Sequence, residues 1–194
     1  MASPSELVQA LVPVVDQLDL LGVRYCIGGS VASSVHGAAR STLDVDVGAE
    51  LDETAALHLV ASLENEFYVS KRAVLDAVRR RSCFNLIHLA TSFKVDIFVS
   101  KGRAFDRSVQ DRAVRDKIGE GGLLAAPIAT AEDIILLKLE WYRLGNETSQ
   151  RQWSDLTAVA KLQADHLDRG YLRHWANELG VVDLAERLLC EVNA

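Results

Sequence analysis

The chain has 194 residues, which is long enough to bury a hydrophobic core in one domain, or in one domain with a small appendage. Hydrophobic residues make up 49% of the sequence and charged residues 25%, as in folded globular proteins, so a disordered tail is excluded. The net charge of -6 argues against a dedicated nucleic-acid-binding coat, which requires Lys and Arg side chains that neutralise phosphates, although it leaves room for a locally basic groove.

The three cysteines and the apolar segments indicate the compartment. Cys26, Cys83 and Cys190 are far apart and have apolar neighbours, which is typical of buried, reduced thiols in a cytoplasm rather than of zinc ligands. The amino terminus has no basic segment before its apolar residues, and Asp16 and Asp19 interrupt those residues, so no signal peptide is predicted. No stretch approaches the roughly 18 apolar residues of a membrane span, and we expect a cytoplasmic protein with no membrane partner.

The first part of the chain alternates between helical and extended patterns. Ser3, Pro4 and Glu6 have the spacing of a helix start with Ser3 as the N-cap, and Gly22 can end that helix. Apolar residues at helical spacing predict further helices at 30–36, 52–64 and 71–81, with a partly extended segment as the alternative at 71–81. Segments rich in β-formers predict strands at 23–27, 43–49, 83–90 and 93–100. We therefore expect a mixed β-sheet with flanking helices.

After Gly121, Gly122 and Pro127 the sequence indicates helices alone. Capping residues at Thr130, Ser149, Asp168 and Asp183 predict helices near 131–144, 150–164, 169–179 and 184–192. The predicted fold class is therefore α+β. An α/β core occupies residues 1–126, and a C-terminal helical bundle occupies residues 127–194.

Acidic residues stand inside two of the predicted strands. Because side chains alternate along a strand, Asp44 and Asp46 point to one face, while Leu43, Val45 and Val47 point into the opposite layer. Like charges held so close raise each other's pKa or recruit a cation, and carboxylate oxygens suit Mg²⁺ or Mn²⁺.

A third acid, Asp96, has the same setting in the strand at 93–100, where the apolar residues occupy the other face. If the two strands are neighbours, three carboxylates meet. Three carboxylates can hold two divalent ions, typically about 3.5 to 4 Å apart, which clamp the attacking and leaving oxygens of an in-line phosphoryl displacement.

A glycine pair precedes the helix expected at 30–36. Gly28 and Gly29 allow a sharp turn and let a phosphate approach the backbone, and Ser30 adds a hydroxyl. Free N–H groups at the start of the helix also attract an anion. The sequence therefore predicts a triphosphate on one side of the site and a metal on the other.

The stretch "GGSVASSVHGAARSTLDVDV", followed by "KVDIF", resembles the nucleotidyltransferases of the polymerase β superfamily. Their signature is Gly-Gly or Gly-Ser, a short helix, Asp-x-Asp or Asp-x-Glu, and a later Asp in a strand. Within that superfamily the chain looks most like the AbiEii-type enzymes of toxin–antitoxin and phage-defence pairs, whose core is followed by helices that carry a Lys and then an Asp. Lys138 and Asp155 match these positions, and the resemblance covers roughly residues 20–165.

The resemblance implies a role for each matching residue. Asp44 and Asp46 would bind both metal ions, and Asp96 would bind one and help to deprotonate an acceptor hydroxyl. Gly29 and Ser30, with Gly28 in the same turn, would hold the terminal phosphates of an NTP.

Three further residues have weaker matches. Lys138 would lie near the triphosphate, and Asp155 would orient Lys138 or another base, or touch the nucleotide. Arg40, four residues before Asp44, stands where many relatives carry a basic residue.

Ordinary structural explanations compete with these roles. A glycine pair alone is a common strand-to-helix turn, and an isolated Asp-x-Asp is more often an exposed edge or a helix cap. Lys138 and Asp155 also suit the solvated edge of amphipathic helices. The basic run at 79–81 is usually a solvated face, with guidance of RNA or another anionic acceptor as the alternative. Core positions, rather than base-stacking platforms, are expected for the tryptophans Trp141, Trp153 and Trp175.

Three functions remain open at this point. The first is transfer of a nucleoside monophosphate from an NTP to a tRNA or protein hydroxyl, by the toxin-like member of a pair with an antitoxin partner. The second keeps this reaction but uses an aminoglycoside- or lincosamide-like antibiotic as acceptor. Nucleotidyltransferases of that kind have a similar glycine-rich opening, and an acidic protein suits a cationic drug. The third is a non-catalytic nucleotide-binding regulator, against which three mutually repelling acids argue.

Overall fold

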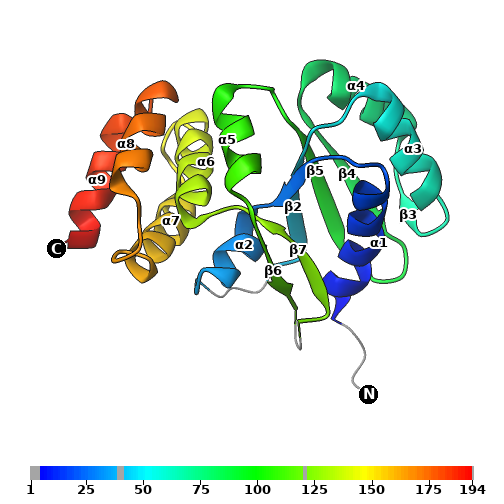
Figure 1. Cartoon of the computed structure of the whole chain (residues 1–194), viewed down its shortest axis with the longest axis horizontal. Coiled ribbons are helices and arrows are strands. Elements are labelled where there is room, and N and C mark those ends of the chain that lie inside the picture. The colour runs from blue at the N-terminus through cyan, green and yellow to red at the C-terminus, as the bar shows by residue number, and fades with distance from the viewer. Residues whose placement is uncertain (1–4, 39–41, 120–121, 194) are drawn as a thin grey trace.

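The computed structural model describes residues 5–38, 42–119 and 122–193. Strands within these residues form a seven-stranded sheet in the order β3-β4-β5-β2-β1-β7-β6 (Figure 1). Their bounds are Tyr25–Ile27 (β1), Asp44–Ala49 (β2), Phe67–Tyr68 (β3), Cys83–His88 (β4), Lys94–Val99 (β5), Val114–Ile118 (β6) and Leu124–Ile128 (β7). β5 runs parallel to β2 and β7 runs parallel to β1, whereas the other neighbours are antiparallel. The expected α+β class with a mixed sheet is confirmed.

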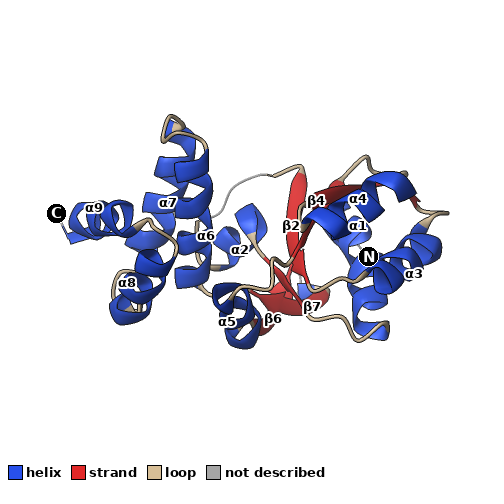
Figure 2. Cartoon of the chain, turned by 90° about the horizontal axis from the view of Figure 1, so that it is seen from above, coloured by secondary structure: helices blue, strands red, loops and turns tan. Residues whose placement is uncertain are grey.

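Helices cover both faces of this sheet, as Figure 2 shows from above. On one face lie α1 (Glu6–Leu20), α3 (Glu53–Leu63) and α4 (Lys71–Arg80). On the other face lie α2 (Gly29–Val35), α5 (Ala104–Arg112) and α6 (Ala131–Leu144). The chain then continues away from the sheet through α7 (Gln150–Leu162), α8 (Arg169–Glu178) and α9 (Val182–Asn193).

Alternation along the central strands separates a core face of the sheet from a polar face. β2 buries Val45 and Val47 and leaves Asp44 and Asp46, on the other face, partly accessible, and β5 buries Val95 and Ile97 in the same layer. Burial of such apolar surface stabilises the fold by about 25 cal/mol per Å². Leu43, for which the pattern predicts this layer, precedes the first strand residue and is 79% exposed.

The C-terminal helices begin at the capping residues that the sequence indicates. Thr130 Oγ1 accepts a hydrogen bond from the backbone N–H of Asp133, 3.3 Å away, at the start of α6. Ser149 and Asp168 cap α7 and α8 in the same way. Each cap satisfies a backbone donor that the helix itself cannot pair, which is why these boundaries are readable from the sequence.

Two helix starts differ from the expectation. α1 begins after Ser5, whose Oγ accepts from the backbone N–H of Val8, while Ser3 and Pro4 lie outside the described residues. Asp183 lies in the first turn of α9 and not at its N-cap position. A carboxylate in the first turn is still favourable, because it faces the positive end of the helix dipole.

Four elements of the core have no counterpart in the sequence-based expectation: β3, α5, β6 and β7. β6 and β7 pair antiparallel and extend the sheet beyond β1. β7 crosses the expected boundary between residues 126 and 127, so Pro127 and Ile128 belong to the sheet. The helical part therefore continues directly from a sheet strand.

Buried polar groups join the start of α6 to α5 and α8. The carboxylate of Asp133 is fully buried and accepts hydrogen bonds from the hydroxyls of Thr130 (2.8 Å) and Tyr171 (2.6 Å). Arg112 of α5 donates to Glu132 at 3.1 Å. Burial raises the pKa of Asp133, although the two hydrogen bonds oppose that shift. The contacts fix the start of α6 relative to α5 and α8.

All three cysteines are free in the structure; Cys26 is buried as expected, whereas Cys83 is partly accessible and Cys190 is exposed. Within the described residues, no helix combines the length and the apolar character that crossing a membrane requires.

Candidate active site

The polar face of the sheet carries a row of functional groups across three strands. The register places Asp46 of β2 beside Asp96 of β5, and Asn85 of β4 beside Asp96 on the other side. Asp44 precedes Asp46 by two residues in β2 and lies beside Lys94 of β5. Neighbouring residues in register share a face, so the three acids face the same side of the sheet.

A second row runs parallel to the first, two residues further along β2 and β5. It contains Cys26, Gly48, Phe98 and Cys83, which are mutual partners in register from β1 to β4. The small Gly48 in the middle of this row leaves space above the sheet. The row forms one wall of a cavity, which is described below.

The glycine turn touches the central acid directly. The backbone N–H of Gly28 donates to the carbonyl oxygen of Asp46 at 2.8 Å. Gly29 has a φ of +57°, and a Cβ atom there would lie 1.8 Å from Oδ2 of Asp46. Two features therefore disfavour a side chain at position 29: the left-handed backbone and the overlap with the carboxylate of Asp46. Ser30 follows in the first turn of α2 and is partly buried.

Protein donors surround the two outer acids. Lys94 Nζ lies 2.7 Å from Oδ2 of Asp96 and 3.8 Å from Oδ2 of Asp44. Asn85 donates to Oδ1 of Asp96, and the Thr42 hydroxyl donates to Oδ1 of Asp44 at 2.7 Å. The hydrogen bond to Asp96 raises the pKa of Lys94, so its ammonium stays charged.

The structure clearly shifts the pKa of Asp46, the central one of the three acids. Burial raises the pKa of Asp46 to about 6, and the negative charges of Asp44 and Asp96 add to the shift. The positive charges of Lys138 and Lys94 oppose it. A carboxylate with a pKa raised in this way is favourable only with a proton or a cation close by.

Lys138 and Asp155 form an ion pair in the helical part, and Lys138 lines the same cavity as Asp46. Lys138 extends from α6, and its Nζ lies 4.0 Å from Oδ2 of Asp155 on α7. The positive charge of Lys138 lowers the pKa of Asp46 and so opposes the effect of burial. Both side chains are largely buried, at 20% and 27% exposure. Arg40 lies outside the described residues, so its position is not compared.

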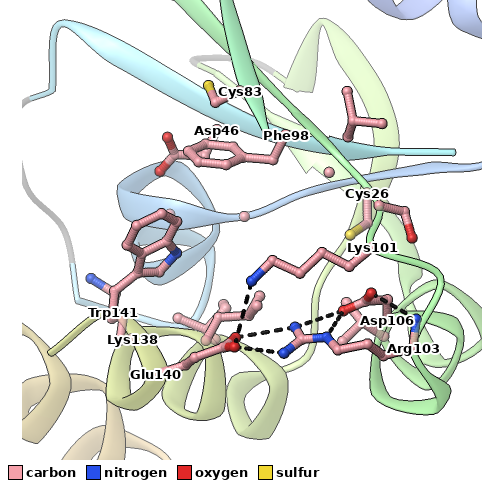
Figure 3. A pocket seen from close by; sticks show the side chains of 18 of the residues that line it. Cys26, Asp46, Cys83, Phe98, Lys101, Arg103, Asp106, Lys138, Glu140 and Trp141 are labelled. Atoms are coloured by element: carbon pink, nitrogen blue, oxygen red, sulfur yellow. Dashed lines mark hydrogen bonds and ion pairs between the residues drawn. The ribbon is translucent and has the colours of Figure 1, made fainter. Parts of the chain in front are cut away.

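A cavity of about 660 Å³ opens between this face of the sheet and α6 (Figure 3). Gly28, Gly29, Asp46 and Lys138 form the side nearest the acids. The second row of the sheet and side chains of α6, among them Leu137, Trp141 and Leu144, line much of the rest. A volume of this size is typical of sites for small organic ligands.

Trp141 does not lie in the core. Its side chain is 50% exposed and meets Phe98 edge to face, with ring centroids 6.0 Å apart. The expectation of a core position is therefore wrong for Trp141, whereas Trp153 and Trp175 are packed against the core. An exposed aromatic ring in a cavity offers a flat surface for stacking.

Ion pairs fix the far side of the cavity. Arg103 donates to both carboxylate oxygens of Glu140, at 2.5 and 3.1 Å, and to Asp106 at 2.8 Å. Lys101 Nζ lies 3.7 Å from Glu140, as the dashed lines in Figure 3 show. A bidentate pair of this kind holds α6 at a defined distance from α5.

The acids suit a divalent metal in their chemistry, but their present arrangement contains an ammonium group instead. Carboxylate oxygens are the ligands that Mg²⁺ and Mn²⁺ prefer, and the charges of Asp44 and Asp96 add to the rise that burial causes in the pKa of Asp46. Within residues 5–38, 42–119 and 122–193, no three acidic, His or Cys side chains are gathered closely enough to hold a metal. Lys94 lies between Asp44 and Asp96.

Comparison with known proteins gives structural relatives only. No protein-family model and no curated protein matches the sequence. Among solved structures, an antigenic nucleotidyltransferase-like protein from Paracoccidioides brasiliensis is similar, with a TM-score of 0.55 and 17% identity over 98% of this chain and 94% of that chain. The antibiotic-resistance factor ANT(2'')-Ia is similar with a TM-score of 0.56 and 15% identity, over 95% of this chain and 93% of that chain.

The chain has a nucleotidyltransferase fold. The likeness extends over the sheet and the C-terminal helices alike, since almost the whole of each chain is covered. Within this fold, Gly28, Gly29, Asp46 and Lys138 line the same cavity, and Asp44 and Asp96 are the neighbours of Asp46 on the polar face of the sheet.

Sequence reasoning missed three groups of this site: Lys94, Asn85 and Trp141. Strand alternation carried a signal for Lys94, because a residue two positions before Asp96 shares its face. Asn85 becomes a neighbour only through the pairing of β4 with β5, which no local pattern reveals. Trp141 stands at helical spacing from Leu137 and Leu144, and this stripe of α6 lines the cavity.

Proposed function

We propose that the protein is a nucleotidyltransferase that moves a nucleoside monophosphate from an NTP to a hydroxyl acceptor. The acceptor oxygen would attack the α-phosphorus, the bond to the β-phosphate would break, and pyrophosphate would leave. The observation that carries this proposal is the contact of Asp46 with the Gly28–Gly29 turn on one side and its register with Asp96 on the other. This arrangement joins a place for phosphates to a place for cations.

Each group in the site has a proposed part in this reaction. Asp44, Asp46 and Asp96 would hold Mg²⁺ or Mn²⁺, which supplies positive charge to the phosphates when bound. Asp96 would also help to remove the proton of the acceptor hydroxyl. Gly28, Gly29 and Ser30 would bind the terminal phosphates through backbone N–H groups and the hydroxyl.

The helical part would complete the phosphate site. Lys138 would add a positive charge beside the triphosphate, and its 4.0 Å contact with Asp155 would orient the ammonium group. Arg40 is retained as a further basic contributor on the basis of the sequence resemblance alone.

We assign the nucleoside of the NTP to the cavity beyond Asp46. The cavity is lined by Gly28, Gly29, Asp46 and Lys138 but not by Asp96, so it adjoins the phosphate side of the site and not the acceptor side. Trp141 would stack on the base, which typically contributes about 1 to 3 kcal/mol.

We propose two candidate classes of acceptor. The resemblance to AbiEii-type enzymes favours a tRNA or protein hydroxyl and a toxin-like role beside an antitoxin partner. The structural likeness to the antibiotic-resistance factor ANT(2'')-Ia favours an antibiotic acceptor as the second candidate.

A labelling experiment tests the reaction and the acceptor together. The purified chain would be incubated with Mg²⁺ and each of the four α-labelled NTPs, in separate reactions with total tRNA, a protein extract or an aminoglycoside. We expect label on one acceptor class and none with Asp46→Asn. Asp165→Asn, an exposed Asp outside the site, is the matched control and should retain activity. NTP binding without labelling of any acceptor would instead support a non-catalytic regulator.

A further inference from the structure

Lys94 forms ion pairs with two of the three acids. Its ammonium bridges Asp96 at 2.7 Å and Asp44 at 3.8 Å, on the same face as Asp46. The remaining oxygens of these two acids accept from Asn85 and Thr42. The outer carboxylates are therefore bound by protein donors in the arrangement that the structure shows.

An ammonium group at this position neutralises part of the repulsion among the acids. Two unit charges about 4 Å apart interact weakly in water and several times more strongly at the lower effective dielectric of a protein surface. Lys94 carries one charge against three carboxylates, so it compensates them only in part. A divalent ion compensates them further but requires the same oxygens.

We propose that Lys94 is a positioning residue that acts as an internal counter-ion: it occupies the cation position between Asp44 and Asp96 and has to leave when a divalent metal binds there. This inference rests on the proposed function, because it takes these acids as the metal ligands. Metal affinity is then set by a competition inside the protein, and Lys94 lowers it.

The side chain is suited to such an exchange. Lys94 is 39% exposed on its side chain, whereas Asp96 is 11% exposed, so the lysine has a route to solvent that the acid lacks. Its long flexible stem allows the ammonium to move several ångströms without any change in the strand. Asn85 can keep Asp96 in place during this movement, because it binds the other carboxylate oxygen.

The test is a titration of the metal-free chain with Mn²⁺ alone, in which calorimetry measures the binding. Lys94→Met keeps the stem and removes the charge, and we expect it to bind Mn²⁺ about tenfold more tightly than the wild type, since one neighbouring charge commonly shifts an equilibrium at a carboxylate by about that factor. Lys94→Arg retains the charge and should stay within about threefold of the wild type. Lys94→Gln provides a second neutral variant if the Met variant does not fold.

A charge control separates local competition from a general effect of net charge. Lys101→Met removes a positive charge whose ion-pair partner is Glu140, 3.7 Å away, and should change the Mn²⁺ affinity by less than about twofold. Equal affinity of the wild type and both neutral Lys94 variants would overturn the proposal, as would an equal gain in Lys101→Met.

The two proposals fail in different ways. If the wild type and the Lys94 variants all fail to bind Mn²⁺ at millimolar concentrations, the metal-dependent reaction and the role of Lys94 are both refuted. If the wild type binds Mn²⁺ and Asp46→Asn does not, but neutral Lys94 variants gain nothing, only the counter-ion role is refuted.

Discussion

Substitution of Asp46 by Asn should stabilise the metal-free protein while abolishing its activity. The folded structure raises the pKa of Asp46 from 3.8 to about 6, chiefly through burial and then through Asp44 and Asp96. Because the folded state holds this proton more tightly than the unfolded chain, the group favours folding below about pH 4 and loses that contribution as the pH rises through 6. A shift of about two pKa units corresponds to about 3 kcal/mol at neutral pH.

Urea unfolding in EDTA at several pH values measures this effect. At pH 7.5 we expect Asp46→Asn to have a free energy of unfolding about 2 to 3 kcal/mol above that of the wild type, and the difference should shrink towards zero near pH 4. Asp165→Asn should stay within about 0.5 kcal/mol throughout, as exposed substitutions usually do. An Asn variant that is no more stable than the wild type at pH 7.5 would refute the description of Asp46 as a repelled, buried charge.

Two further substitutions address the glycine turn and the cavity. Gly29→Ala should destabilise the chain by more than about 2 kcal/mol, because of the left-handed backbone and the overlap with Asp46, whereas Gly102→Ala, at a φ of +73° with open space around it, should lose only about 1 kcal/mol in thermal unfolding. Equal losses would show that the overlap does not matter. Trp141→Ala should weaken NTP binding about 5- to 100-fold in calorimetry with a change in stability below about 1 kcal/mol, and unchanged affinity would place the base elsewhere.

The faces of the central strands were predictable, but their order in the sheet was not. Alternation in 43–49 and 93–100 is a local property, so it showed that Asp44, Asp46 and Asp96 each stand opposite an apolar layer. Whether β5 lies beside β2 depends on the path of the chain through α3, β3, α4 and β4, which no periodicity encodes. The resemblance supplied that neighbourhood, and the register supplied the pairing of Asp46 with Asp96.

The unpredicted strands have physical reasons for escaping detection. β6 is an edge strand in which four of five residues are exposed, so it lacks the alternation of a half-buried strand. β7 contains two alanines and Pro127, residues that are uncommon in strands. The C-terminal helices were easier, because their caps and apolar stripes are both written into short segments.

Different residues of α6 attach the helix to α5 and line the cavity. Glu132 and Glu140 anchor it to arginines at opposite ends of α5, whereas Leu137, Trp141 and Leu144 line the cavity and take no part in these ion pairs. Substitutions at the second set therefore remodel the shape of the cavity while the scaffold that carries it stays where it is. A library confined to positions 137, 141 and 144 is the economical starting point for changing which ligand the protein accepts.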